Sequence, residues 1–293
     1  MLLEGHADGV NGVKFSPDGT VLASCGADKV VNLWKVSGDC ENYMMMRGHK
    51  NTVLELHWTA DGDNLVTCSP DKSVRCCVKN MRGHQAFVNS CAPSTRGDPL
   101  VISGSDDGTA KLWDLRRKHA VRTFPHRFQV TAVAFSKDAS QVYTGGVDNV
   151  LRAYDVRKED APYLTLPGHT DTITGIATSP DGTHVLTNAM DCTLRMWDVQ
   201  PYASGDRCVK YFTGHSHNFE KTLLRCSWSA DGTRVSAGSS CANVFVWDVD
   251  SRRVVYKLPG HGGTVGEVAF HPKEPVIASG SADHKIYLGE LAD

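Results

Sequence analysis

The sequence predicts an all-β protein folded as a seven-bladed β-propeller. Gly-His recurs along the chain, with successive repeat histidines 43, 35, 42, 43, 46 and 46 residues apart. In most copies the His is followed by a hairpin signal, a Ser or Thr, an Asp and an aromatic residue with Asp, as in Trp113-Asp114. Such a period indicates one supersecondary unit copied along the chain. The repeat histidines are His6, His49, His84, His126, His169, His215 and His261.

Short stretches of alternating apolar residues, such as 30–34 and 244–247, lie between the turn signals of each copy. They predict about four strands per copy. Asp-Gly pairs such as Asp18-Gly19 supply the positive φ angles of tight hairpins. A lone sheet exposes both faces, whereas radial stacking of sheets buries them and leaves short edges. We therefore expect residues 1–293 to form a single propeller.

The charge balance argues against a dedicated nucleic-acid-binding protein. The chain has 31 basic and 33 acidic residues and a net charge of −2, whereas nucleic-acid binders usually carry a basic excess or stripe. We expect RNA contact to be minor at most. The chain also has no long apolar run, and residues 1–6 lack the features of a signal peptide, so we expect neither membrane insertion nor secretion.

The ten cysteines do not form a metal-binding or disulfide pattern, because no CxxC pair or repeated Cys/His spacing occurs. Cys25 and Cys68 occupy small-residue positions directly after the repeat Ser and Thr. We expect free, buried thiols in a reducing compartment. His215 and His217 lack a third ligand nearby in the sequence, so we expect no metal and no other cofactor.

A His, a Ser or Thr, and an Asp recur together, as in His84, Ser103 and Asp107, and could be mistaken for a catalytic triad. An enzyme needs one such site in a cleft, whereas this set is copied at fixed repeat positions. We therefore expect no catalytic residues and no small-molecule substrate.

The order of these residues, together with the aromatic-Asp pair, resembles the WD-repeat family over the whole chain. The resemblance implies a buried hydrogen-bond network inside each complete blade. The networks that we expect most directly consist of His6, Ser24, Asp28 and Trp34; His84, Ser103, Asp107 and Trp113; and His169, Thr187, Asp191 and Trp197. The fourth copy offers His126, Thr144 and Asp148 for the same role.

Three copies depart from the pattern, and the seventh ends in Leu288-Gly289-Glu290 instead of Trp-Asp. The sixth has Ala237 and Cys241 in place of Ser or Thr and Asp, so we expect apolar packing to hold that blade. The second has Cys77 at the Trp position and is about seven residues shorter than the third. We expect an incomplete, poorly ordered blade two, or a sequence shortened by a mistaken gene model.

Closure of the ring also differs from the usual arrangement in propellers. Propellers usually let an N-terminal strand complete the last blade, but only residues 1–4 precede the first Gly-His here. We expect either closure by a very short N-terminal segment or an N-terminal extension that has been lost.

The loops between blades hold candidate binding residues. In the sixth copy, eight positions separate His215 from Leu223, against four in most copies. Phe87 and Phe128 fall in the equivalent loops of the third and fourth copies. Two interpretations remain open for these aromatic residues: binding anchors on a rigid face, or side chains packed into their own blades.

Arg116 and Arg157 follow the aromatic-Asp pairs of the third and fourth copies. A solvated rim is the default interpretation, with a minor contribution to RNA phosphate binding as one alternative. A second alternative is docking onto the adaptor of a cullin–RING ubiquitin ligase, because Trp-Asp-x-Arg matches a short motif used for that purpose. The chain would then be a substrate receptor of the ligase.

Segments outside the repeat pattern carry a more specific resemblance. Residues 38–43, 188–191, 217–228 and 251–261 resemble WD-repeat subunits of the spliceosomal U5 small nuclear ribonucleoprotein, and the similarity runs from Met1 to Leu291. The shortened second copy and the missing leader depart from that family. The resemblance implies a non-enzymatic scaffold in the nucleus that acts in pre-mRNA splicing. It would dock on the largest U5 protein, beside neighbouring spliceosomal proteins.

We place this docking on one face of the propeller. The inserted loop contributes Phe219, Glu220 and Lys221, which interrupt the period and belong to the family-specific text. The other expected contacts are Phe87, Phe128 and Met190.

Overall fold

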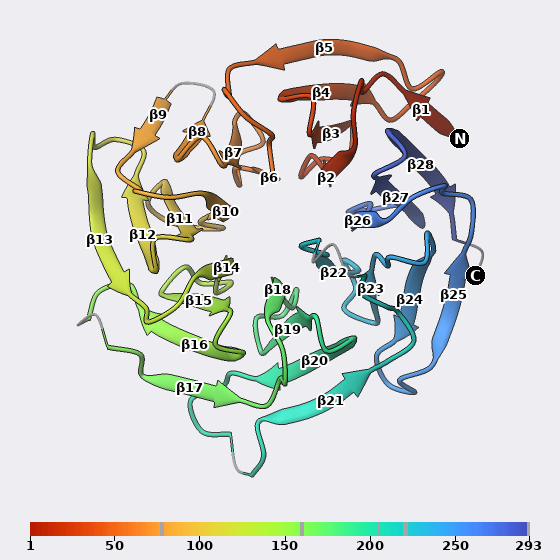
Figure 1. Cartoon of the computed structure of the whole chain (residues 1–293). Helices are drawn as coiled ribbons and strands as arrows, with labels where there is room; N and C mark the ends of the chain where they lie inside the picture. The colour runs from red at the N-terminus through yellow and green to blue at the C-terminus, as the bar shows by residue number, and fades with distance from the viewer. Residues whose placement is uncertain (77–78, 159–160, 204, 219–221, 292–293) are drawn as a thin grey trace.

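Seven four-stranded antiparallel sheets form a ring of blades in the computed structural model (Figure 1). The structure describes residues 1–76, 79–158, 161–203, 205–218 and 222–291, and within these ranges it contains strands and turns but no α-helix. The all-β class and the seven-bladed propeller predicted from the sequence are therefore confirmed.

Six blades are built from four successive strands of the chain, and the seventh joins the N-terminal strand to the last three described strands; in each blade the strand called first below is innermost (Figure 1). The first strands are β2 (Val10–Phe15), β6 (Glu55–Trp58), β10 (Val88–Pro93), β14 (Val130–Phe135), β18 (Ile173–Thr178), β22 (Cys226–Trp228) and β26 (Val265–Phe270). The second strands are β3 (Val21–Gly26), β7 (Leu65–Ser69), β11 (Leu100–Ser105), β15 (Gln141–Gly146), β19 (His184–Ala189), β23 (Arg234–Ala237) and β27 (Val276–Ser281).

The outer half of each blade continues in the same order. The third strands are β4 (Val30–Lys35), β8 (Ser73–Cys76), β12 (Thr109–Asp114), β16 (Val150–Asp155), β20 (Thr193–Asp198), β24 (Val244–Asp248) and β28 (Lys285–Glu290). The outermost strands are β5 (Asn42–Arg47), β9 (Lys79–Arg82), β13 (Ala120–Pro125), β17 (Leu164–Pro167), β21 (Cys208–Phe212), β25 (Val254–Leu258) and β1 (Leu2–Glu4).

This connectivity gives the ring two faces, because consecutive antiparallel strands alternate in direction. The loops between blades and the turns between second and third strands, such as those with His84 and Asp107, lie on one face, called here the His face. The turns between first and second strands, and between third and outermost strands, lie on the opposite face, called here the hairpin face.

The tight turns form where the sequence supplies their residues. In the first hairpin, the Gly19 amide donates to the Ser16 carbonyl at 2.9 Å and Gly19 has a φ of 87°. The Ser16 hydroxyl donates to the Asp18 carboxylate at 2.5 Å. A left-handed residue at this point suits Gly, which has no Cβ to clash.

Ring closure follows the first of the two expected routes. The three-residue strand β1 pairs with β28, with Leu3 opposite Ile286, and completes the sheet of blade seven. The Met1 amino group also donates to the Leu288 carbonyl at 2.6 Å. The prediction of closure by a very short N-terminal segment is confirmed.

Blade two is shortened, as predicted, but the expectation that it is incomplete is wrong. It has all four strands, and the outermost one, β9, pairs with β8 through Met81 opposite Val74. Within the described residues, β8 and β9 have four residues each, against six in β12 and β13. The outer strand survives because four residues still provide a ladder, while Cys77, at the Trp position, lies outside the described residues.

The core lies between neighbouring blades. Trp113 of blade three is buried in one cluster with Val74 and Met81 of blade two, and Trp197 of blade five in one with Leu151 and Leu166 of blade four. The indole at the Trp position therefore seals its own blade against the preceding one.

Candidate functional site

Blades one, three and five contain the expected four-residue network. In blade three, the His84 ring lies 2.8 Å from the Asp107 carboxylate through Nδ1 and 2.7 Å from the Ser103 hydroxyl through Nε2. Trp113 donates its indole N–H to the same hydroxyl at 2.8 Å. Since a carboxylate only accepts, His84 Nδ1 donates and its Nε2 accepts the Ser103 proton.

The other two networks have the same geometry. The members in blade one are His6, Ser24, Asp28 and Trp34, and those in blade five are His169, Thr187, Asp191 and Trp197. The hydroxyl-bearing residues Ser24, Ser103 and Thr187 are 0% exposed. A nucleophile enclosed in this way cannot meet a substrate, which favours a structural role.

Blades two and seven keep the His–hydroxyl–Asp part and lack the Trp. His49 contacts Asp71 at 3.0 Å and Thr67 at 2.8 Å. His261 contacts Asp283 at 3.1 Å and Ser279 at 2.8 Å. The polar network therefore forms without an indole donor.

Blade four does not form the expected network. Asp148 pairs with Arg152 instead of His126, and Tyr154 has no indole N–H to donate to Thr144, whose hydroxyl is buried without a partner. His126 contacts the Tyr154 hydroxyl at 3.4 Å. Burial, followed by the Arg152 charge, lowers the pKa of His126 to about 4, so this histidine is neutral.

Blade six is not held by apolar packing alone, contrary to expectation. Trp247 stacks on Phe245 at 5.7 Å, but its indole N–H also donates to the Thr213 carbonyl at 2.9 Å. His215 turns to the Asn188 side chain of blade five, 2.9 Å away. Substitute hydrogen bonds therefore serve the two groups that the missing hydroxyl would have bonded, whereas His215 Nδ1, which would have faced the missing Asp, is buried without a partner among the described residues.

The sequence analysis missed a charged residue at the centre of the ring. Arg225 is buried and donates to the carbonyls of Asn89 and Thr174, each at 2.6 Å, and to that of Thr131 at 3.2 Å. Its guanidinium also lies 3.5 Å from the Glu55 carboxylate. Arg225 thereby ties blade six to blades two, three, four and five.

The Arg225–Glu55 pair is ionised. Burial raises the pKa of Glu55, but Arg225 and the His57 hydrogen bond lower it further, to about 2. Burial lowers the pKa of Arg225, and the Glu55 charge reverses that shift and raises it. Removing one member of such a buried pair costs about 3–5 kcal/mol, because the other charge is left uncompensated. In the sequence, the only indication of this central role is that Arg225 directly precedes an inner strand, β22.

On the His face, Phe87 and Phe128 are 50% and 43% exposed. The turn between β11 and β12 lies between them, because the Asp106 amide donates to the Phe87 carbonyl at 2.9 Å and the His126 amide to the Gly108 carbonyl at 2.8 Å. These aromatic side chains are therefore only partly packed into their own blades. The Arg127 guanidinium lies 5.3 Å from the centre of the Phe128 ring.

Met190 lies on the same face in the turn between β19 and β20 and is half-buried. Val147, which the sequence analysis missed, occupies the corresponding turn of blade four and is 42% exposed. The sequence could have indicated Val147, since both Val147 and Met190 directly precede the repeat Asp position. Phe219, Glu220 and Lys221 lie outside the described residues.

Arg116 and Arg157 lie on the hairpin face, after β12 and β16, and so apart from the aromatic residues of the His face. The Arg116 guanidinium is held by Asp114 at 2.9 Å and by Asp98 at 2.9 Å. Arg157 is exposed, and its amide donates to Asp155 at 2.8 Å. The structure therefore divides the predicted contact residues between two faces.

The nine cysteines within the described ranges are free, and six of them are buried. His215 and His217 have ring centres 5.7 Å apart, and burial lowers their pKa values to about 3 and about 4. Among the described residues, no group of three potential ligands could hold a metal ion. The same residues include no helix that could cross a membrane.

The fold and the repeated networks define a WD-repeat propeller. The family model for the WD domain, G-beta repeat, matches residues 1–35, 40–76, 75–114, 118–155, 161–198, 206–248 and 252–288. The mouse U5 small nuclear ribonucleoprotein 40 kDa protein is 54% identical over 99% of this chain and 83% of its own length. The Dictyostelium discoideum protein of the same name is 47% identical over 99% and 84%. The pre-mRNA-splicing factor cwf17 of Schizosaccharomyces pombe is 38% identical over 98% and 86%. The chain belongs to the WD-repeat family and, within it, to the family of U5 small nuclear ribonucleoprotein 40 kDa proteins.

Proposed function

We propose that this chain is a non-enzymatic scaffold subunit of the U5 small nuclear ribonucleoprotein, that it acts in pre-mRNA splicing in the nucleus, and that it docks on the largest U5 protein. The observation that carries the proposal is similarity along nearly the whole chain to proteins named for U5 and for splicing. A rigid ring whose hydroxyl groups are enclosed in structural networks suits a scaffold better than an enzyme.

The docking surface in this proposal is the His face of blades three to five. Phe87 and Phe128 are half-exposed aromatic side chains on a rigid rim, and such residues frequently dominate binding energy. Val147 and Met190 extend the apolar surface between them and blade five. The loop residues Phe219, Glu220 and Lys221 remain part of the proposal as a prediction from the sequence.

The partners in the proposal are proteins, with RNA contact at most minor, because the net charge of −2 gives little attraction to phosphate. The alternative, a ubiquitin-ligase substrate receptor, depends on the Trp-Asp-x-Arg arginines. Arg116 is already paired with Asp114 and Asp98, which weighs against its service as a free docking residue.

Affinity purification of the tagged full chain from nuclear extract, with and without nuclease, tests the proposal. We expect the largest U5 protein to be recovered after RNA digestion. The double variant Phe87→Ala/Phe128→Ala should weaken this recovery at least about 30-fold if both residues are hot spots. A parallel variant, Phe219→Ala/Lys221→Glu, tests the loop.

Tyr202→Ala provides the matched control, because Tyr202 is 97% exposed and follows a third strand on the hairpin face. Unchanged recovery of the double Phe variant would contradict the docking surface. Recovery of a cullin and its adaptor without splicing factors would contradict the scaffold function itself.

A further inference from the structure

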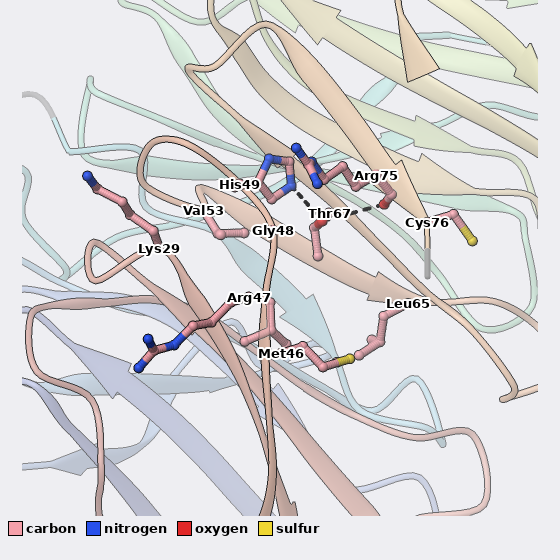
Figure 2. Close-up of a pocket in the computed structure, with 11 residues that line it drawn as sticks. Lys29, Met46, Arg47, Gly48, His49, Val53, Leu65, Thr67, Arg75 and Cys76 are labelled. Carbon is pink, nitrogen blue, oxygen red and sulfur yellow. Dashed lines mark hydrogen bonds between the residues drawn. The ribbon is translucent and has the colours of Figure 1, made fainter. Parts of the chain in front are cut away.

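Blades one and two are separated near the His face by a hollow of about 330 Å3 (Figure 2). In the view shown, Met46 and Leu65 lie on one side of the hollow, and His49, Thr67 and Arg75 on the other. Lys29 and Arg47 stand at its margin. The volume is at the lower end of the range for small-ligand sites, about 300–1,000 Å3.

The hollow occupies the position at which other blades place an indole. A Cβ on Gly5, Gly83 or Gly168 would meet the ring of the Trp in its own blade at 2.8, 3.2 and 2.8 Å. For the equivalent glycine of blade two, Gly48, the three nearest atoms among the described residues all belong to Arg75, with a guanidinium nitrogen at 2.9 Å. The sequence has Cys77 where those blades have Trp.

The wall of the hollow on blade one also matches an indole-binding wall. Val31 pairs with Met46 across β4 and β5, as Val74 pairs with Met81 beneath Trp113 and Leu151 with Leu166 beneath Trp197. Val31 and Met46 both line the hollow.

The polar partner of the indole is present as well. Thr67 lines the hollow and holds His49 at 2.8 Å, as Ser103 holds His84. In blade three that hydroxyl also accepts the Trp113 indole N–H. In blade two, the Thr67 hydroxyl is therefore the equivalent acceptor for an N–H group of a bound ligand.

The margin of the hollow is basic. Lys29, Arg47 and Arg75 line it, and none of the described lining residues is acidic. The buried Nε of Arg75 has no hydrogen-bond partner, and Arg75 also borders a second hollow with Lys50, Lys72 and Arg82. The carboxylate in that second hollow, Asp71, is already bonded to His49 and Ser73.

We propose that this hollow binds a peptide segment of a protein partner that inserts a Trp or another large aromatic side chain between blades one and two and carries carboxylates on either side of it. The apolar wall and the Thr67 hydroxyl accept the ring, and Lys29, Arg47 and Arg75 accept the carboxylates. The site is distinct from the aromatic surface of blades three to five and does not depend on the docking proposed for that surface.

A peptide fits these features better than RNA does. Single-stranded RNA is usually held by bases stacked on aromatic side chains or on Arg planes. The described residues that line the hollow include no Phe, Tyr or Trp, and Val31, Met46, Val53 and Leu65 give it an aliphatic wall. Aliphatic walls favour a buried aromatic anchor with charged neighbours at the rim.

The full chain can be titrated against a fluorescein-labelled peptide, Gly-Glu-Asp-Trp-Glu-Asp-Gly, with binding measured by fluorescence anisotropy. We expect saturable binding that weakens at least about 30-fold when the peptide Trp is replaced by Ala, as for a hot-spot residue. Replacing the acidic residues of the peptide by Lys should abolish binding. A labelled oligouridine serves as the RNA probe.

Two variants of the chain locate the binding. Met46→Glu places a carboxylate in the hollow and should abolish binding. Arg47→Glu changes an exposed side chain, leaves the packing intact and should weaken binding about 3- to 10-fold. The control is Lys273→Glu, an exposed charge reversal on the hairpin face of blade seven, which should have no effect.

Binding that ignores the Trp, or that survives both Arg47→Glu and Met46→Glu, would overturn the proposal. So would binding of oligouridine, but not of the peptide, with sensitivity to Arg47→Glu. None of these results affects the proposed U5 function, which recovery from nuclear extract tests, or the docking surface of blades three to five, which the Phe87 and Phe128 variants test.

Discussion

Blades two and three are neighbours built from the same repeat, yet they differ in one component. Both hold a buried His bonded to an Asp and to a hydroxyl group. Blade three adds Trp113, which bonds Ser103 and covers Val74 and Met81 of blade two. The described residues of blade two include no aromatic side chain equivalent to Trp113, and a hollow lies between blades one and two. The hydrogen-bond network within a blade and the packing between neighbouring blades therefore depend on different residues of the repeat.

The largest expected effect comes from giving blade three the composition of blade two. Trp113→Ala removes a fully buried side chain and an indole hydrogen bond, so we expect the free energy of unfolding to fall by about 3–5 kcal/mol in urea titrations. Trp113→Phe keeps most of the packing and should cost less. Equal losses for the two variants would contradict a sealing role for the ring.

An intermediate effect tests whether the polar parts of the two blades are equivalent. Asp71→Asn in blade two and Asp107→Asn in blade three should each lower the free energy of unfolding by about 1.5–3 kcal/mol at pH 7. Burial raises the pKa of Asp71, but hydrogen bonds from Ser73 and the Lys50 amide lower it further, to about 2. Because the folded pKa is below the unfolded value near 3.8, this stabilisation is present above pH 4 and is lost as the pH falls toward 2.

Stability curves measured at several pH values check this expectation. The difference between wild type and Asp71→Asn should shrink as the pH falls below 4, and the Asp107→Asn difference should shrink with it, since hydrogen bonds also keep the pKa of Asp107 low against the effect of burial. A loss confined to blade three would show that the polar part needs the Trp after all.

The smallest effect comes from restoring the repeat residue in blade two. Cys77→Trp supplies the aromatic residue that blades one, three and five have at this position, and filling a hollow typically stabilises a protein by about 0.5–2 kcal/mol. Cys77→Ser is the control without a ring. If Cys77→Trp destabilises the chain, the hollow does not match the shape of an indole.

The sequence was sufficient for the ring, because turn residues and alternating strands recur along the whole chain, with repeat histidines 35 to 46 residues apart. The predictions from the sequence were wrong in blades four and six, where a side chain forms its hydrogen bond or ion pair with a different residue from the one expected. Arg152 takes Asp148 away from His126, and Asn188 receives His215 across a blade boundary. Neither exchange follows from local spacing, since it depends on which side chains converge in space.

The candidate functional residues could also be predicted from the sequence only in part. Sequence position placed Phe87 and Phe128 in loops between blades but left their exposure open, because exposure depends on what covers a side chain. Arg225 could not be identified as a central residue, since its partners come from four other blades. The outer strand of blade two survives because pairing needs only a few residues, which a residue count alone did not reveal.

The pairing of β1 with β28 joins the first and the last of the described strands (Figure 1). During synthesis β1 leaves the ribosome before the other strands of the ring, and its partner β28 leaves after them. Until then β1 has no neighbour from its own sheet, and the cost of closing so long a loop must be met in a single late step. The native ring therefore closes only after β28 has emerged, even though most blades can pair their own strands earlier.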